Sequence, residues 1–262
     1  MTIMNKIVIG IGIVSAMFFS TALAEPVEKS NIENKEIKIY IVRHGKTMFN
    51  TLHRVQGWSD SPLTEKGKKD AYMVANGLST IKFDILYTSD LGRARETASI
   101  IKSKQHSNLA VIEDNRLREW NYGGYEGGLD GELWTPIFKK WNLSYDKNFT
   151  QWDQLMSKAT DRDIANEISQ NDPMHWAENY QQIETRLHDS LEDIAKNAEK
   201  NGYKNVLVVS HGGAIGTIID TLTPGKEAVP LIDNMSVTTL SYQGDGTFKL
   251  IKAGDMSYYQ AH

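Results

Sequence analysis

Two histidines in this sequence each follow a short apolar run and precede glycine. His44 stands in the string Arg43-His44-Gly45 after residues 37–42, and His211 stands in Ser210-His211-Gly212-Gly213 after residues 206–209. An imidazole can act as a nucleophile or transfer a proton near neutral pH. The two strings can therefore supply nucleophilic or acid–base chemistry if the fold brings them together.

The surrounding pattern predicts the elements that position these histidines. Short apolar, β-branched runs favour strands and alternate with stretches of helical periodicity. Strands are predicted over 37–42, 85–88, 110–112 and 206–209, helices over 64–78, from 90, over 174–198 and over 214–222, and a C-terminal hairpin over 237–242 and 247–251. This order predicts an α/β fold of three layers, α/β/α, with a mostly parallel central sheet. Ligands gather at the carboxyl ends of such strands, so His44 and His211 are expected to share one crevice.

The segment of about 128–173 differs from the rest because it is rich in Trp, Lys, Asn and Asp. We expect it to form a helical insertion that caps the crevice. Four tryptophans lie in this segment or just after it: Trp134, Trp141, Trp152 and Trp176. Their spacing is more typical of helix packing than of a platform that binds substrate, which stays the alternative. Asp161-Arg162-Asp163 has the spacing of the paired aspartates of magnesium-dependent phosphatases, but no apolar strand precedes it.

Five motifs in order resemble the histidine phosphatase (phosphoglycerate mutase-like) superfamily. They are RHGKTMFN at 43–50, QGWSDSPLTEKG at 56–67, SDLGRARETA at 89–98, LREWNYGGYEG at 117–127 and VVSHGG at 208–213. The resemblance covers the chain from about residue 37 to the final hairpin, with little motif content in the cap. It implies a domain over 37–262.

The resemblance implies a role for five residues. His44 is implied to be the nucleophile that becomes phosphohistidine, and Glu119 to protonate the leaving group and later to accept a proton from water. Arg43, Arg93 and His211 are implied to surround the phosphoryl oxygens, where they neutralise charge in the transition state. With these cations present, we expect no cofactor and no metal.

Four further residues are expected to bind substrate in the same crevice. Asn50 is implied as a neutral donor to the phosphoryl group, although a helix or turn cap is its alternative role. Gln56 and Gly57 are candidates at the rim, where they also suit a loop that only shapes the entrance. Gly212 follows His211 and lies beside the phosphoryl position. Lys46 stands where relatives often carry an acidic residue, and it adds a positive charge near the pocket.

Three reactions or roles fit this pocket. Hydrolysis of a small phosphorylated metabolite is favoured, because mutases resembling phosphoglycerate mutase carry a tandem-arginine element that binds the substrate carboxylate. Between Glu119 and Thr185 this chain has a single arginine, Arg162. Phosphoglycerate mutase-like phosphoryl transfer is the first alternative. A non-catalytic module that binds a phosphorylated ligand is the second.

Composition excludes several other classes of protein. The 262 residues include no cysteine, so disulfide frameworks, thiolate zinc sites and cysteine nucleophiles are excluded. The formal net charge is -4 and no basic block occurs, which argues against a nucleic-acid partner.

Residues 1–24 resemble a secretory signal peptide. Lys6 precedes an apolar run over 7–19 that is shorter than the ~20 residues of a membrane-spanning helix, and Ala22-Leu23-Ala24 fits a cleavage site. We therefore expect residues 25–36 to form a solvated linker, and the mature protein to be exported to a periplasm or secreted by a bacterium, without membrane contact after cleavage. An uncleaved anchor is the alternative.

Overall fold

The computed structural model describes residues 36–105, 108–222 and 232–259, and within them a six-stranded sheet runs in the order β3-β2-β4-β1-β5-β6. The strands are β1 (Ile37–Arg43), β2 (Ile85–Thr88), β3 (Val111–Glu113), β4 (Asn205–Ser210), β5 (Val237–Tyr242) and β6 (Phe248–Asp255). Strands β3, β2, β4 and β1 are parallel, whereas β5 is antiparallel to both β1 and β6. The predicted, mostly parallel sheet is confirmed.

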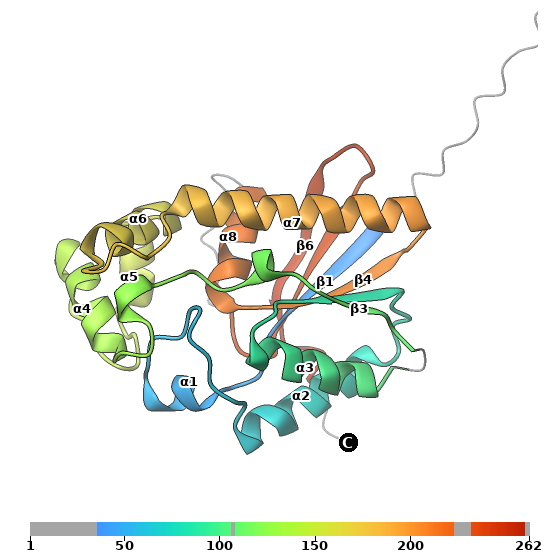
Figure 1. Ribbon diagram of the computed structural model, residues 1–262, viewed down its shortest axis with the longest axis horizontal. Coiled ribbons are helices and arrows are strands. Elements are labelled where there is room, and N and C mark those ends of the chain that lie inside the picture. The colour runs from blue at the N-terminus through green and yellow to red at the C-terminus, as the bar shows by residue number, and fades with distance from the viewer. Residues whose placement is uncertain (1–35, 106–107, 223–231, 260–262) are drawn as a thin grey trace, which may run out of the picture. The chain divides into compact units, whose positions relative to one another are not determined.

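Helices cover both faces of this sheet (Figure 1). Helices α2 (Glu65–Leu78) and α3 (Gly92–Ser103) pack on one face, and α7 (Tyr180–Asn201) and α8 (Gly212–Leu222) pack on the other. Side chains of β1 alternate between the two cores: Ile39 and Ile41 point toward α7 and α8, and Tyr40 and Val42 toward α2 and α3. This arrangement confirms the predicted three layers.

The segment predicted as a cap contains three helices, which lie beyond one end of the sheet (Figure 1). They are α4 (Asp130–Lys140), α5 (Trp152–Met156) and α6 (Asp161–Asn171). Trp134, Phe149 and Trp152 pack edge to face between α4 and α5, with ring centroids 5.5–5.8 Å apart. Three short elements complete the order: α1 (Met48–Leu52), η1 (Asn115–Leu117) and η2 (Gly123–Tyr125).

Several predicted boundaries are wrong. The helix expected from residue 174 begins at Tyr180, because Asn179 caps it in a capping box with Gln182. Before that cap, the Asp172 carboxylate accepts hydrogen bonds from the backbone N–H groups of Met174 and Trp176, which holds the segment in a turn. At the C-terminus, β6 extends to Asp255, beyond the predicted end at residue 251.

The predicted signal peptide lies outside the described residues, as does all of the predicted linker except Glu36. Across the ranges that the structure describes, no helix is long and apolar enough to cross a membrane.

Candidate active site

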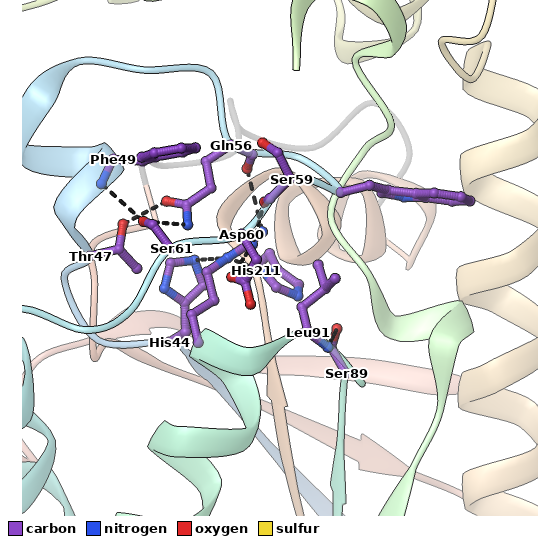
Figure 2. Close-up of polar contacts among 12 residues, drawn as sticks. His44, Thr47, Phe49, Gln56, Ser59, Asp60, Ser61, Ser89, Leu91 and His211 are labelled. Atoms are coloured by element: carbon purple, nitrogen blue, oxygen red, sulfur yellow. Dashed lines mark hydrogen bonds and ion pairs between the residues drawn. The ribbon is translucent and has the colours of Figure 1, made fainter. Parts of the chain in front are cut away.

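The two histidines meet where adjacent parallel strands end. Arg43, the last residue of β1, pairs in register with Ser210, the last residue of β4. His44 and His211 follow directly, and their rings lie 5.1 Å apart. Figure 2 shows the two rings close together below the segment that carries Gln56 and Ser59. The parallel register therefore brings the two histidines together, as the sequence led us to expect.

Arg93 of α3 joins the two rings. Its single Nε–H points at His44 Nε2 and at His211 Nδ1, each 3.2 Å away. Both nitrogens must accept this hydrogen, so in each ring the proton sits on the other nitrogen. In His44 that other nitrogen is Nδ1, which donates to the carbonyl oxygen of Gly45 at 2.9 Å. His44 Nε2 therefore carries a lone pair.

Burial and neighbouring charge keep both imidazoles neutral. Burial, followed by the positive charges of Arg93 and Arg43, holds the pKa of His44 well below its usual value. Burial and Arg93 act in the same direction on the pKa of His211. A neutral His44 is the form required of a nucleophile, since a protonated Nε2 has no free electron pair.

Two nitrogens at this point are buried without a hydrogen-bond partner among the described residues: Arg43 Nε and His211 Nε2. Arg43 Nε is a donor because it belongs to a guanidinium group. His211 Nε2 is a donor because His211 Nδ1 already accepts from Arg93, which leaves the ring proton on Nε2. A Cβ on Gly212 would come within 3.2 Å of the Arg43 guanidinium, so glycine keeps this space open. Unsatisfied buried donors are costly, and an oxyanion bound beside His44 would satisfy them.

Arg93 divides its donors between the histidines and a loop. Its NH1 group donates to the Ser59 carbonyl oxygen at 3.0 Å and to Asp60 Oδ1 at 2.9 Å, and NH2 donates to the Gly57 carbonyl oxygen at 2.7 Å. Only Nε faces the histidine pair. The structure thus places Arg93 beside the two histidines, but most of its hydrogen bonds hold the segment 56–60 rather than the histidine pair.

Glu126 holds the same loop from its other side, and the sequence analysis missed it. Its carboxylate accepts hydrogen bonds from the backbone N–H groups of Gly57, Trp58 and Ser59 at 2.7–3.1 Å, and from that of Tyr122 at 3.0 Å. Gly57 is required here, since a Cβ would approach the Trp120 carbonyl oxygen to 2.1 Å. Glu126 lies within the LREWNYGGYEG string, but no local pattern reveals its contact with the distant loop.

Glu119 lies at the N-terminus of α8, beside the strand end that carries His211. Its carboxylate accepts from the backbone N–H of Gly213 at 2.9 Å and from that of Ala214 at 2.8 Å, groups that the helix leaves free in its first turn. From α7, Arg186 donates to the Glu119 carbonyl oxygen at 2.7 Å. These contacts fix the carboxyl of Glu119, a residue that is 7% exposed, at the cavity wall.

Asn50 and Gln56 combine structural contacts with a place at the cavity. The Asn50 side chain accepts from the backbone N–H of Thr47 in the capping box of α1, which was its alternative role. Gln56 Oε1 accepts from the Thr47 hydroxyl, and Gln56 Nε2 donates to Ser61 Oγ at 3.2 Å. Both side chains also line the cavity, so capping does not remove Asn50 from reach of a ligand.

A cavity of about 450 Å³ is lined by Arg43 and Gly212, which are the chain neighbours of His44 and His211, and by residues of the cap; the two histidines themselves are not among its lining residues. Its wall includes Asp161, which the sequence analysis considered only as part of a rejected magnesium motif. Predicted site residues and cap residues line it together, namely Arg43, Asn50, Gln56, Glu119, Gly212, Trp134, Phe149, Trp152 and Asp161. Within the described ranges, no group of three or more His, Asp and Glu side chains could hold a metal ion.

Known proteins resemble this chain over most of its length. A probable phosphoglycerate mutase GpmB of Shigella boydii serotype 18 is 32% identical over 232 residues, which cover 86% of this chain and 96% of that protein. The crystal structure of a phosphoglycerate mutase from Bacillus anthracis has a TM-score of 0.78 and 36% identity, over 87% of this chain and 97% of that one. The structure of YhfR of Bacillus stearothermophilus has a TM-score of 0.65 and 28% sequence identity, over 86% of this chain and 100% of that one. The model of the histidine phosphatase superfamily (branch 1) matches residues 39–255, and the chain belongs to that superfamily.

Proposed function

We propose that the protein hydrolyses a small phosphomonoester through a phosphohistidine on His44. One observation carries this proposal: the His44 Nε2 lone pair lies in a site with two buried donors, Arg43 Nε and His211 Nε2, that lack partners among the described residues. A phosphoryl group carries charge on its non-bridging oxygens, and these donors suit such oxygens.

The proposed reaction proceeds in two steps. In the first, His44 Nε2 forms a bond to phosphorus as the ester P–O bond breaks, and the departing alkoxide takes a proton from Glu119. In the second, water attacks phosphohistidine, Glu119 accepts the proton of that water, and inorganic phosphate leaves with His44 neutral again. The cavity position of Glu119 supports both roles.

Phosphoryl transfer of the mutase kind is the second candidate, because two of the three relatives compared above are named as phosphoglycerate mutases, one of them as a probable one. Hydrolysis is favoured by the place of Arg162, the one arginine between Glu119 and Thr185. Arg162 stacks on the Tyr180 ring with 4.3 Å between its guanidinium carbon and the ring centroid, and it pairs with Glu184. It is therefore engaged on α7 rather than at the cavity wall.

One experiment separates the candidates. The protein is incubated with 3-phosphoglycerate and with a set of sugar phosphates and nucleotides, and both inorganic phosphate and 2-phosphoglycerate are measured. Release of phosphate with no isomer supports hydrolysis, and isomer with little free phosphate supports the mutase. Binding of these phosphates with no phosphohistidine on His44 would leave only the non-catalytic module.

Export is a separate part of the proposal and rests on the sequence of residues 1–24. It is tested by expressing the full chain in a bacterium, separating periplasm from cytoplasm, and measuring the mass of the protein recovered. A mature protein beginning at Glu25 in the periplasm supports cleavage after Ala24. A full-length protein in the membrane fraction would support the anchor instead.

A further inference from the structure

The cavity lined by Arg43 and Gly212 is larger than a phosphoryl group requires. Its volume of about 450 Å³ lies in the range of pockets that enclose drug-sized ligands, ~300–1,000 Å³. Arg43 and Gly212 line the part where the phosphoryl group is proposed to bind, and residues of α4, α5 and α6 are among those that line the remainder. This remainder is where the alcohol portion of a phosphomonoester would lie.

Aromatic side chains form one wall of that remainder. Three half-buried rings line the cavity, so part of each ring faces it. They belong to Trp134 of α4, to Phe149, which precedes α5, and to Trp152 of α5. The three rings hold one another edge to face, with interplanar angles of 79–82°. A preformed aromatic wall favours a planar, apolar group and loses little entropy when it binds.

Asp161 adds an acidic side chain to a cavity wall that also includes Lys46, Arg54 and Lys147. It is the first residue of α6, it is half-buried, and it lines the cavity. No described residue forms a hydrogen bond or ion pair with its carboxylate. Asp163 differs, because its carboxylate accepts from Thr160 in the capping box of α6. The helix therefore uses Asp163 and leaves Asp161 directed to the cavity.

The charges that act on Asp161 are also negative. Burial raises the pKa of Asp161 to about 7, and the carboxylates of Asp220 on α8 and Glu119 add to this effect. An isolated carboxylate in a half-buried wall is unfavourable unless a donor or cation meets it. A cationic group on a ligand would supply that partner.

We propose that the cap cavity binds an alcohol portion that carries an aromatic ring and a terminal ammonium group, with the ring against Trp134, Phe149 and Trp152 and the ammonium at Asp161. The proposal rests on the proposed hydrolysis at His44 and names the substrate class of that site: phosphomonoesters of aryl-alkyl amines. Both features are needed, because the aromatic wall alone does not select a charge and Asp161 alone does not select a ring.

The test uses four primary alkyl phosphates, namely propyl phosphate, 3-phenylpropyl phosphate, 3-(4-ethylphenyl)propyl phosphate and 3-(4-aminomethylphenyl)propyl phosphate. All four release a primary alcohol, so the chemical step makes the same demand on Glu119 and differences in kcat/KM report binding of the alcohol portion. We expect about a tenfold or greater gain from propyl to phenylpropyl, as burial of a ring provides. We expect a further gain, of about tenfold, from the ethyl to the aminomethyl compound.

Two variants assign these gains to residues. Asp161→Asn is expected to bring the ratio of kcat/KM between the aminomethyl and ethyl compounds close to one, whereas Trp152→Leu is expected to lower the ratio between phenylpropyl and propyl phosphate. Asp189→Asn is the matched control, since this exposed residue on α7 loses the same charge far from the cavity wall. It should leave both ratios unchanged.

Several results would overturn the inference. Equal kcat/KM for propyl and phenylpropyl phosphate would remove the aromatic subsite, and equal loss on the aminomethyl and ethyl compounds in Asp161→Asn would remove the ammonium site. In both cases continued release of phosphate leaves the proposed function intact. If no compound gives phosphate or a phosphorylated His44, the proposed function fails and the inference fails with it.

Discussion

The rings of His44 and His211 lie 5.1 Å apart, and each turns one nitrogen toward the same N–H of Arg93. This shared hydrogen makes both nitrogens acceptors and thereby sets the tautomers of the pair. One ring then presents a lone pair, His44 Nε2, and the other presents an N–H, His211 Nε2. The position of a single arginine thus gives two identical side chains the two forms that the proposed reaction needs, an acceptor at His44 Nε2 and a donor at His211 Nε2.

His44 is expected to carry the phosphoryl group during turnover. Brief exposure to labelled substrate followed by a denaturing quench should trap an acid-labile, base-stable phosphoenzyme. His44→Ala should lack the label and lose at least about a thousandfold in kcat/KM. His188→Ala is the control, because this histidine is exposed on α7, where its nearest ionic partners are the carboxylates of Asp189 and Glu192. Label that persists on the His44→Ala protein would exclude His44 as the nucleophile.

Glu119 is expected to act on the leaving group, and varying that group tests the role. An alkoxide is a poor leaving group and needs a proton in the transition state, whereas p-nitrophenolate leaves largely without one. Glu119→Gln should therefore slow phosphorylation of His44 by an alkyl phosphate about 100 to 10,000-fold, with a clearly smaller loss for p-nitrophenyl phosphate. Single-turnover kinetics are required because the proposed mechanism gives Glu119 a role in the second step as well. Equal losses on both substrates would indicate a role in folding or in phosphate positioning.

The sequence predicted those features that follow from strand and helix patterns. The proximity of His44 and His211 was predictable because parallel strands place their carboxyl ends at one edge of the sheet. The helix over 65–78 was predictable from its apolar spacing and its Thr64 cap. The superfamily and the three-layer fold followed from the motifs and the alternation of elements, and both are confirmed.

Features that depend on long-range packing were not predictable. Glu126 accepts hydrogen bonds from a loop nearly seventy positions earlier in the chain, and no spacing in the sequence encodes that contact. Asp161 reaches the cavity wall only through the packing of α6, in a segment with little motif content. The division of the Arg93 donors between loop and histidines likewise depends on atomic positions rather than on residue type.

Glu126 is expected to act as a positioning residue for Arg93 through the loop between them. Glu126→Gln puts an amide donor where backbone N–H groups already donate, so the free energy of unfolding should fall by about 1–3 kcal/mol in urea titrations. Release of the loop should also lower kcat more than it raises KM. Glu192→Gln on the surface of α7 is the control, and a change within about 0.5 kcal/mol is expected there. Unaltered kcat with reduced stability would limit Glu126 to a structural role.

Activity is expected to need no divalent metal. Arg43, Arg93 and His211 provide positive charge or donors where a metal would otherwise act. Dialysis against a chelator should therefore leave the kcat/KM of the purified protein unchanged, and added magnesium or zinc should not raise it. Loss of activity that one specific metal restores would contradict this assignment of the pocket.

Asp161 is expected to make stability depend on pH in a defined direction. Its pKa is about 7 in the folded protein, raised by burial, against 3.8 for an unperturbed aspartate. Below about pH 4 the carboxyl is protonated in both states and has no effect. As the pH rises toward 7 the unfolded chain loses this proton while the folded protein retains it, so folding is progressively disfavoured and the cost is complete above about pH 7.

Removing that carboxyl should remove the pH dependence it causes. Asp161→Asn should become more stable than the wild-type protein between about pH 4 and 7, by roughly 1–2 kcal/mol after solvent screening, as measured by urea unfolding at each pH. Asp189→Asn is again the control, because its exposed carboxylate is solvated in both states. Parallel stability curves for Asp161→Asn and the wild-type protein would show that the carboxylate already has a partner when ionised, and such a partner would also leave no place for a ligand ammonium.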